Sequence, residues 1–461
     1  MAKETGLIQR VRLVAAGMII TALLHALAFS ERSCRALAFS LGLTSDVEIS
    51  RQAVWKLLRK PAIVPFLQKI IAFALEQNLR QTPVLRLASN TADILAGVGR
   101  ILVGDATTVC LHPSLAAYFP GSTNQTSVPK SHLKIQLTAD LITGRSVHFS
   151  LDPYKRSDMK AALDFIPFLQ KGDLLIRDLG YSSVECLKAI IEHGAYFISR
   201  LKARDAVFDE NGVELDLLSQ LRKAAPNPGM VVRLRVKLTN KGRMDCDLVA
   251  IRVPEEVANE RRRKLKAKHK EQGWSPPSKD YLARQDWTLL ITNLPESVAD
   301  NKKITELYLM RWRIEMIFKA AKSHSGLLKA AGHKTNANHA QALVLAWVLM
   351  MIALAAMEVF ALGRLREVHC PLAGCMVSEL EIHNASLFKM LEKTAQRLGF
   401  YLEMAACGND LALHIKRTRH YEGIHNRTEL TPSRKALSEV LGSVLELEVE
   451  AGKMSGATAL S

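Results

Sequence analysis

Two short apolar runs, each closed by an acidic residue, constrain the fold of this chain most strongly. They are residues 101–105 (ILVGD) and 174–178 (LLIRD). Runs this short and this apolar are typical of strands buried in a sheet, and each ends at or near its acid. Helical patterns follow at 157–169 and 183–193, so strands alternate with helices. The sequence therefore predicts a mixed α/β domain.

The chain is basic, with 62 Lys and Arg against 45 Asp and Glu and a formal net charge of +17. Its 48% of hydrophobic residues excludes a largely disordered protein. The charge favours a polyanionic partner, nucleic acid or less often an anionic membrane surface. The seven cysteines form no C-x-x-C pair, so we expect small buried side chains rather than a zinc site.

Two apolar stretches resemble membrane segments but are too short to cross a bilayer. Residues 13–24 follow basic positions, as in a signal peptide, and residues 342–357 carry no charge. A bilayer span needs about twenty residues. We predict that both stretches are buried helices. The predicted location is therefore the bacterial cytoplasm, with no membrane partner.

A polar stripe runs along the helix predicted for residues 304–323. At about 100° per residue, its functional side chains share an arc of about 100°. They are Tyr308, Arg311, Trp312, Glu315, Lys319 and Lys322. One carboxylate among cations suits a metal ligand that faces a phosphate backbone, whereas the alternative is a surface salt-bridge face of small energetic value.

Asp105 and Asp178 give that stripe a second interpretation. Together with Glu315 they place three carboxylates on two strands and one helix. Carboxylates are the ligands that Mg²⁺ accepts, and two such ions activate water and stabilise a leaving oxygen. Two other acids are weaker candidates: Asp140, predicted in a turn, and Asp173, at the start of a strand.

Three motifs resemble the DDE insertion-sequence transposases of the IS-four family, which includes the Tn-five type. Residues 308–322 (YLMRWRIEMIFKAAK) match the Y-R-E-K signature in register. Residues 178–181 (DLGY) resemble the D-x-G-Y motif, and 104–107 (GDAT) resemble the first motif. The resemblance covers about residues 98–330. It implies an RNase H-like catalytic domain with a mostly β insertion between the second Asp and the Glu.

The resemblance also implies roles for individual residues. Asp105, Asp178 and Glu315 are the catalytic, metal-binding triad for two Mg²⁺ ions, with Mn²⁺ as a substitute. Trp287 resembles the insertion-domain Trp that stacks on a flipped base; the alternative is an aromatic packed against the core. Arg200 follows a strand and faces either DNA or only solvent. The residues expected to hold DNA are Tyr308, Arg311, Lys322, Trp287, Lys319 and Arg200.

Five regions follow from these patterns. They are a helical DNA-binding region (1–95), the first part of the catalytic core (96–202), the β-rich insertion (203–297), the second part of the core (298–364) and a helical, dimerising C-terminal region (365–461). Within the first region, residues 51–60 are basic and amphipathic, with Trp55 expected to be buried. The basic run 261–270 is either a solvated face or a phosphate contact.

The function expected from the resemblance is cut-and-paste transposition. The enzyme would cleave DNA at the terminal inverted repeats and join the ends to target DNA, as a homodimer in the synaptic complex. Two alternatives stay open. One is another RNase H-like nuclease, such as a junction resolvase, and the other is a transposase-derived protein that binds DNA without catalysis.

Overall fold

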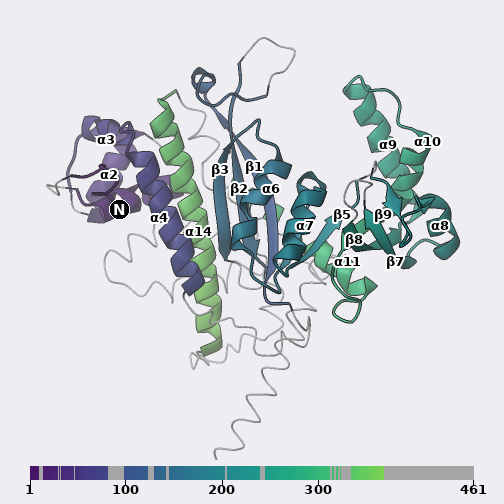
Figure 1. The fold of residues 1–461 in the computed structure, drawn as a ribbon. Coiled ribbons are helices and arrows are strands. Elements are labelled where there is room, and N and C mark those ends of the chain that lie inside the picture. Colours follow the sequence, from purple (N-terminus) through teal and green to yellow (C-terminus); the bar gives the residue numbers. More distant parts are fainter. Residues whose placement is uncertain are drawn as a thin grey trace, which may run out of the picture.

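The computed structural model describes residues 1–9, 14–29, 31, 33–45, 47–80, 98–122, 129–141, 145–202, 205–238, 244–311, 314–315, 318–319, 322 and 334–367, with the backbone alone at 78–80 and 354–367. A large sheet forms the centre, with helices on both sides of it (Figure 1). The mixed α/β class predicted from the sequence is confirmed.

Among the described residues, four helices precede the sheet: α1 (Ala16–Ala28), α2 (Cys34–Ser45), α3 (Arg51–Leu58) and α4 (Ile63–Arg80). α2 packs on α1 and α3, whereas α1, α3 and α4 pack with the long helix α14 (Ala337–Glu367), which lies alongside α4 in Figure 1. Leu23, Phe66 and Trp347 are fully buried between them. Both apolar stretches therefore lie in buried helices, as predicted, where the structure describes them. Over the described residues, no helix is long and apolar enough to cross a membrane.

The sheet has nine strands in the order β3-β2-β1-β4-β5-β9-β8-β7-β6. β1 pairs in parallel with β4, and β4 with β5, whereas the remaining neighbours are antiparallel. The strands are β1 (Ile101–Leu111), β2 (Ser131–Asp140), β3 (Ser146–Pro153), β4 (Leu174–Arg177), β5 (Tyr196–Arg200), β6 (Val207–Phe208), β7 (Val231–Leu238), β8 (Met244–Arg252) and β9 (Trp287–Thr292).

Successive residues of β1 pack into different cores. Val103 and Val109 face the core shared with α4 and α14, whereas Leu102 faces α6 (Asp158–Asp164) and α7 (Val184–Glu192). This alternation follows from the period of two in a strand. Ser157 and Ser183 accept backbone hydrogen bonds as N-caps of α6 and α7.

The helix predicted for residues 157–169 is broken in the structure. α6 ends at Asp164, and a 3₁₀ turn, η2 (Ile166–Phe168), replaces the last turns. Pro167 explains the break, because proline lacks the N–H that would continue an α-helix and clashes with the preceding turn. Three further 3₁₀ turns are η1 (Pro113–Leu115), η3 (Leu179–Tyr181) and η4 (Arg284–Asp286).

The segment predicted as a mostly β insertion is mixed. Besides β6 to β9 it contains α8 (Leu217–Ala224), α9 (Glu255–Glu271) and α10 (Lys279–Ala283). The basic run forms most of α9. Its first members are structural, since Arg261 donates to Trp287 O at 3.2 Å and Arg262 pairs with Asp286. β9 pairs with β5, so the insertion extends the central sheet.

The predicted helix at 304–323 begins earlier, as α11 (Asn301–Met310), because Asp300 caps it by accepting from Lys303 N. Beyond Arg311, residues 314–315, 318–319 and 322 are helical where they are described. Trp312 lies outside the described residues, and so do all but the first three residues of the predicted dimerisation region. The five region boundaries remain predictions.

Removing the Asp173 carboxylate should destabilise the fold. Asp173 is 1% exposed and binds Arg100 through two contacts of 2.9 and 2.5 Å. Breaking a buried pair leaves an uncompensated charge, so Asp173→Ala should lower the free energy of unfolding by about 3 kcal/mol. Urea unfolding measures this. Asp164→Ala, which breaks a more exposed pair with Arg156, should cost at most about 1 kcal/mol; equal losses would contradict the argument.

Candidate active site

Two of the predicted carboxylates lie on adjacent strands. β1 and β4 are in parallel register at Gly104 and Arg177, and Asp105 and Asp178 are the next residues of each chain segment. By strand alternation both carboxylates share the face of Val103 and the helices α4, α11 and α14. Asp178 directly follows its strand, as predicted. Asp105 does not end a strand, because β1 continues to Leu111.

The third carboxylate comes from the helical residues that follow α11. Glu315 Oε1 lies 2.6 Å from Nη1 of Arg311, one helical turn earlier. The Tyr308 hydroxyl donates to Asp178 Oδ1 at 3.4 Å, which brings α11 to the end of β4. Glu315, Asp178 and Arg311 all act electrostatically on Asp105. The structure thus assembles the three acids around one guanidinium.

Burial raises the pKa of Asp105 to about 6. The Ala106 N–H, 2.8 Å away, and Arg311 partly offset this, whereas Glu315 and Asp178 add repulsion. Burial alone would lower the pKa of Arg311, but its acidic and phenolic neighbours raise it overall. Arg311 is therefore the cation that balances the site in this structure.

These residues suit a hard divalent cation in ligand type and charge. Carboxylate oxygens are preferred ligands of Mg²⁺, and a buried, mutually repelling set is stabilised by added positive charge. In the described part of the chain, no three His, Cys, Asp or Glu side chains already stand close enough to hold one ion together. The Glu315 carboxylate is engaged with Arg311 instead. The chemistry fits, and the close approach of the ligands is not preformed.

Other cations surround the carboxylates. Lys322 Nζ donates to Thr108 O of β1 at 3.1 Å. Lys319 is exposed, and so is Arg200 at the end of β5. Burial is the main influence on the pKa values of Tyr308 and Arg261, and the charge of Arg200 lowers both, because it favours the phenolate of Tyr308 and repels the guanidinium of Arg261. Arg200 therefore lies near Tyr308 of α11 and Arg261 of α9. Lys322 thus lies beside β1 and Arg200 beside Tyr308. The two weaker candidates are buried, and Asp140, predicted in a turn, is the last residue of β2.

Trp287 is not placed as a base-stacking residue. It is 3% exposed, at the start of β9, and its ring packs into the core beneath the insertion. The guanidinium of Arg252 lies 5.5 Å from its ring centroid. This favours the alternative interpretation, an aromatic that packs against the core, because a ring so covered has no free face for a base.

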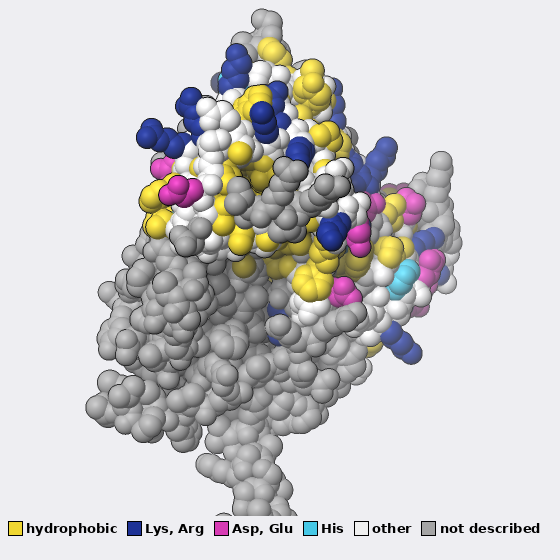
Figure 2. Space-filling view, turned by 90° about the vertical axis from the view of Figure 1, so that its left-hand side faces the viewer, with side chains coloured by type: hydrophobic (Ala, Val, Ile, Leu, Met, Phe, Trp, Pro, Cys, Tyr) yellow, Lys and Arg dark blue, Asp and Glu magenta, His cyan; other side chains and the backbone are white. Residues whose placement is uncertain are grey.

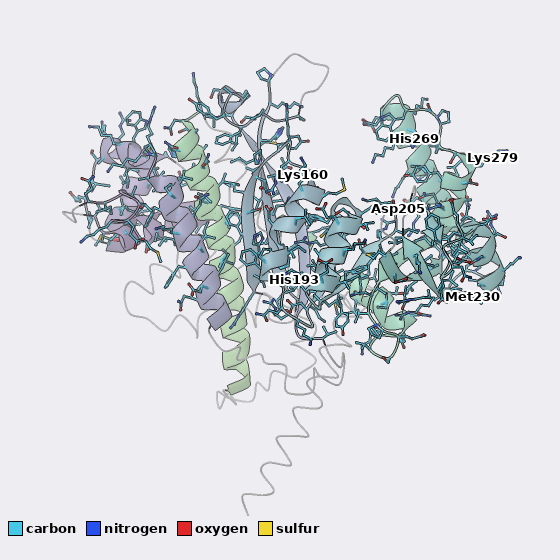
Figure 3. The ribbon with its side chains drawn as sticks, in the orientation of Figure 1. Lys160, His193, Asp205, Met230, His269 and Lys279 are labelled. Carbon is cyan, nitrogen blue, oxygen red and sulfur yellow. The ribbon has the colours of Figure 1, made fainter. Side chains whose placement is uncertain are left out.

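Two exposed tryptophans were missed by the sequence reasoning. Trp274 follows α9, is 54% exposed and contacts the ring of His269, which Figure 3 labels. Trp55 of α3 is 47% exposed, not buried as predicted, and the Arg59 guanidinium lies 4.2 Å from its ring centroid. Their basic neighbours in the sequence were the available signal, since aromatic residues among cations are typical of nucleic-acid surfaces.

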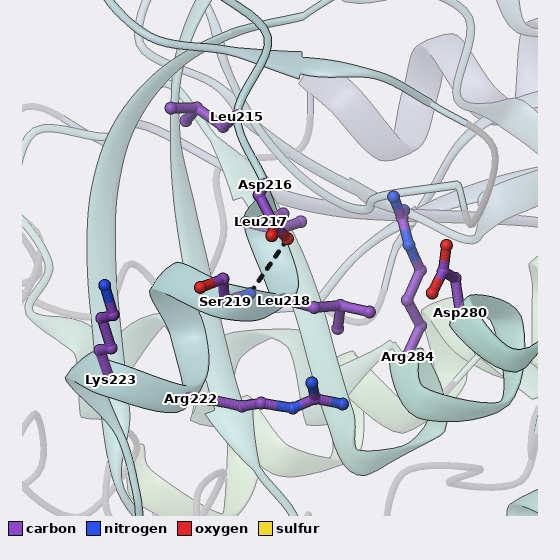
Figure 4. A pocket seen from close by; sticks show the side chains of 9 residues that line it. All are labelled: Leu215, Asp216, Leu217, Leu218, Ser219, Arg222, Lys223, Asp280 and Arg284. Atoms are coloured by element: carbon purple, nitrogen blue, oxygen red, sulfur yellow. Dashed lines mark hydrogen bonds between the residues drawn. The ribbon is translucent and has the colours of Figure 1, made fainter.

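A polar pocket of about 710 Å³ lies in the insertion, between α8 and α10 (Figure 4). Of its lining residues, Asp216 caps α8 by accepting from Ser219 N at 3.2 Å. None of the predicted site residues lines it. The lining residues are Leu215, Asp216, Leu217, Leu218, Ser219, Arg222, Lys223, Asp280 and Arg284.

Comparisons with known proteins bear on this arrangement. The family model described as "Transposase DDE domain" matches residues 96–351. The chain is 30% identical over 279 residues to the transposase for insertion sequence element IS231B of Bacillus thuringiensis subsp. berliner, covering 56% of each protein. It is 23% identical over 306 residues to that for IS1151 of Clostridium perfringens, covering 62% of each.

The chain spans about half the length of the curated relatives that it matches first. Among solved structures, a piggyBac transposase synaptic complex with hairpin DNA overlaps with a TM-score of 0.42 at 11% identity, over 95% of this chain and 79% of that one.

Replacing Asp105 by Asn should stabilise the protein at high pH. Because the folded pKa, about 6, exceeds the ordinary value of 3.8, the folded state binds the proton more tightly. The wild-type free energy of unfolding therefore falls as pH rises from 4 through 6, and the penalty is complete above 6. Asp105→Asn should gain on the order of 2 kcal/mol at pH 8 and little at pH 4.

Urea unfolding at the two pH values measures this difference. Asp164→Asn is a control of opposite sign, because hydrogen bonding to Arg156 lowers the pKa of Asp164. Its loss of stability should appear at high pH. A gain from Asp105→Asn that is equal at pH 4 and pH 8 would show that burial does not raise this pKa.

Proposed function

Because the chain belongs to the transposases with a DDE domain, we propose that it carries out cut-and-paste transposition of an insertion sequence. It cleaves DNA strands at the terminal inverted repeats and transfers the ends into target DNA. One observation carries this proposal: Asp105 and Asp178 stand on adjacent parallel strands, on the face that also receives Glu315. The other RNase H-like nucleases and a binding-only descendant are not favoured, because the family match covers the whole acid-bearing region.

The catalytic core is RNase H-like in this proposal. Its support is the strand order β3-β2-β1-β4-β5, with three antiparallel strands followed by two parallel ones. β9 then pairs antiparallel with β5, and β8, β7 and β6 follow. The insertion is thus joined to the core through β5, the strand that carries Arg200.

Asp105, Asp178 and Glu315 are the proposed ligands of two Mg²⁺ ions, which Mn²⁺ can replace. When bound, such ions lower the pKa of water and stabilise the leaving oxygen. With a pKa of about 6, Asp105 is ionised at neutral pH and is ready to act as a ligand. Glu315 becomes available when the Arg311 guanidinium releases the Glu315 carboxylate and binds a DNA phosphate instead. A guanidinium forms paired hydrogen bonds with either group.

The cations around the acids are proposed to hold the DNA backbone. Arg311, Lys319 and Lys322 follow one helical stripe, and Tyr308 adds a phenolic donor beside Asp178. Neither an ammonium nor a guanidinium has a lone pair for a metal, so these groups neutralise phosphates instead. Arg200 extends the same surface toward the insertion. Trp287, because it is buried, is proposed to support β9 rather than contact a base.

The N-terminal region is proposed to bind duplex DNA through α3. Residues 51–60 contain four cations and no acid, while Val54 and Leu58 anchor the helix in the core. Lys and Arg gather on the face shown in Figure 2, together with exposed apolar side chains. Asn338 Nδ2 of α14 donates to Arg59 O at 3.0 Å, which fixes the end of α3 against the helix that follows the catalytic residues.

Assembly and location follow from the proposed reaction. Two ends must be joined together, so we propose a homodimer in the synaptic complex, with the region 365–461 as its interface. Because the proposed substrates are terminal-repeat and target DNA, we propose a location in the bacterial cytoplasm, at the nucleoid when DNA is bound.

The triad makes a direct prediction. Asp105→Ala, Asp178→Ala and Glu315→Gln should each reduce Mg²⁺-dependent cleavage of terminal-repeat DNA by several orders of magnitude, because metal-borne chemistry needs every ligand. Affinity for the uncleaved end should stay within a few-fold. Gel-based cleavage and fluorescence anisotropy measure the two quantities. Glu192→Gln, an exposed acid on α7, is the control; normal cleavage by any triad variant removes that residue from the triad.

Salt dependence tests the α3 surface. If Lys56 and Arg59 contact phosphates, replacing both by Ala should reduce the slope of log K against log salt by about 0.9 for each lost contact. The double variant of Lys160 and Lys171, both exposed on the catalytic core, removes the same charge elsewhere. An α3 slope indistinguishable from that control would place the DNA contact on another element.

A further inference from the structure

Arg177 is a buried arginine that the proposed function does not yet use. It directly precedes Asp178 and is 7% exposed. By strand alternation its side chain lies on the opposite face of the sheet from the two aspartates, among the residues packed under α6. Within the described ranges, no carboxylate lies at salt-bridge distance from its guanidinium. Buried charges are normally paired, so this arginine calls for an explanation.

Neutral groups hold the guanidinium in one position. Nη1 donates to Ala162 O at 3.2 Å and Nη2 to Thr138 Oγ1 at 3.4 Å. The rings of Phe165 and Tyr181 lie 5.0 and 5.1 Å away, which suits cation–π contacts. The group therefore connects β4 to β2 and to α6, passing beneath β1, which lies between β4 and β2.

Gly104 leaves the space that this guanidinium occupies. The two residues are register partners in the β1–β4 pair. A Cβ added at Gly104 would lie 2.8 Å from Arg177 Nε, closer than real Cβ atoms approach, and 3.1 Å from Thr138 Oγ1, which is a tight contact. Glycine is needed here for close packing. Gly104 and Arg177 immediately precede Asp105 and Asp178, so any shift between them moves both carboxylates.

We propose that Arg177 is a positioning residue, packed against Gly104, that sets the spacing between the Asp105 and Asp178 carboxylates. This inference rests on the proposed function, because it assumes that the two aspartates bind metal together. The guanidinium fixes β4 against β1 and β2 from the face opposite the ions. Groups that orient metal ligands without touching the metal typically affect affinity or activity by 10- to 100-fold.

The test is a double-mutant cycle on Gly104→Ala and Arg177→Leu in the full chain, because leucine ends before the Nε position that the new methyl meets. Each single variant should weaken Mn²⁺ binding about tenfold, by electron paramagnetic resonance of free Mn²⁺, and should slow cleavage. In the double variant, Gly104→Ala should add little, because the group that the new methyl meets has been removed. This coupling is the signature of their contact.

Two controls separate positioning from general damage. Gly99→Ala adds the same methyl just before β1, where the nearest atoms are 3.9 Å away, and should bind Mn²⁺ normally. Urea unfolding identifies variants that remain folded at the assay temperature. If Arg177→Leu does not fold, Arg177→Val completes the cycle, because valine is β-branched, suits a strand and also has no atom at the Nε position.

Two results would overturn the inference: wild-type Mn²⁺ affinity in Gly104→Ala, or costs of the two substitutions that simply add. A different result would reject the proposed function itself: the Asp105→Ala variant would retain Mn²⁺ binding and cleavage. Loss in Asp105→Ala with normal behaviour in Gly104→Ala rejects the positioning role alone.

Discussion

The parallel pairing of β1 with β4 is the constraint on which the rest of the site depends. It brings together two chain segments more than seventy residues apart and sets them in a register that makes Asp105 and Asp178 neighbours. Side-chain alternation then sends both carboxylates to one face and Arg177 to the other. The helices on the two faces complete this division, since α11 supplies Tyr308 on one side and α6 receives the guanidinium on the other.

Charge balance is the second organising feature. Burial raises the pKa of Asp105, and repulsion from Glu315 and Asp178 adds to that effect. Arg311 offsets it through its contact with Glu315. The same guanidinium is suited to a phosphate, so the proposed binding of metal and the proposed binding of DNA are linked at this residue. In the structure, a cation from the protein itself thus compensates these carboxylates.

The insertion serves the site by extending the sheet. β9 continues from β5, so the basic helix α9 is held at a fixed place relative to the end of β5, where Arg200 lies. Arg261 and Arg262 are used to attach α9 to β9 and η4, which leaves the later cations of the helix for solvent or DNA. Only part of the basic run is therefore available to a partner.

The sequence alone determined the α/β class, the buried helices and the motif residues, because apolar periodicity and fixed spacings are local properties. Asp173 shows the limit of local sequence patterns, because nothing in the residues around it indicated its ion pair with Arg100. Tertiary structure also decided which tryptophan side chains are buried and which are exposed. Trp287 is covered by the core beneath the insertion and Trp55 is left outside, since burial depends on which segments meet, which spacing does not encode. The close contact of Arg177 with Gly104 likewise exists only because two distant strands pair. The sequence of one strand does not indicate which other strand will lie beside it in the sheet.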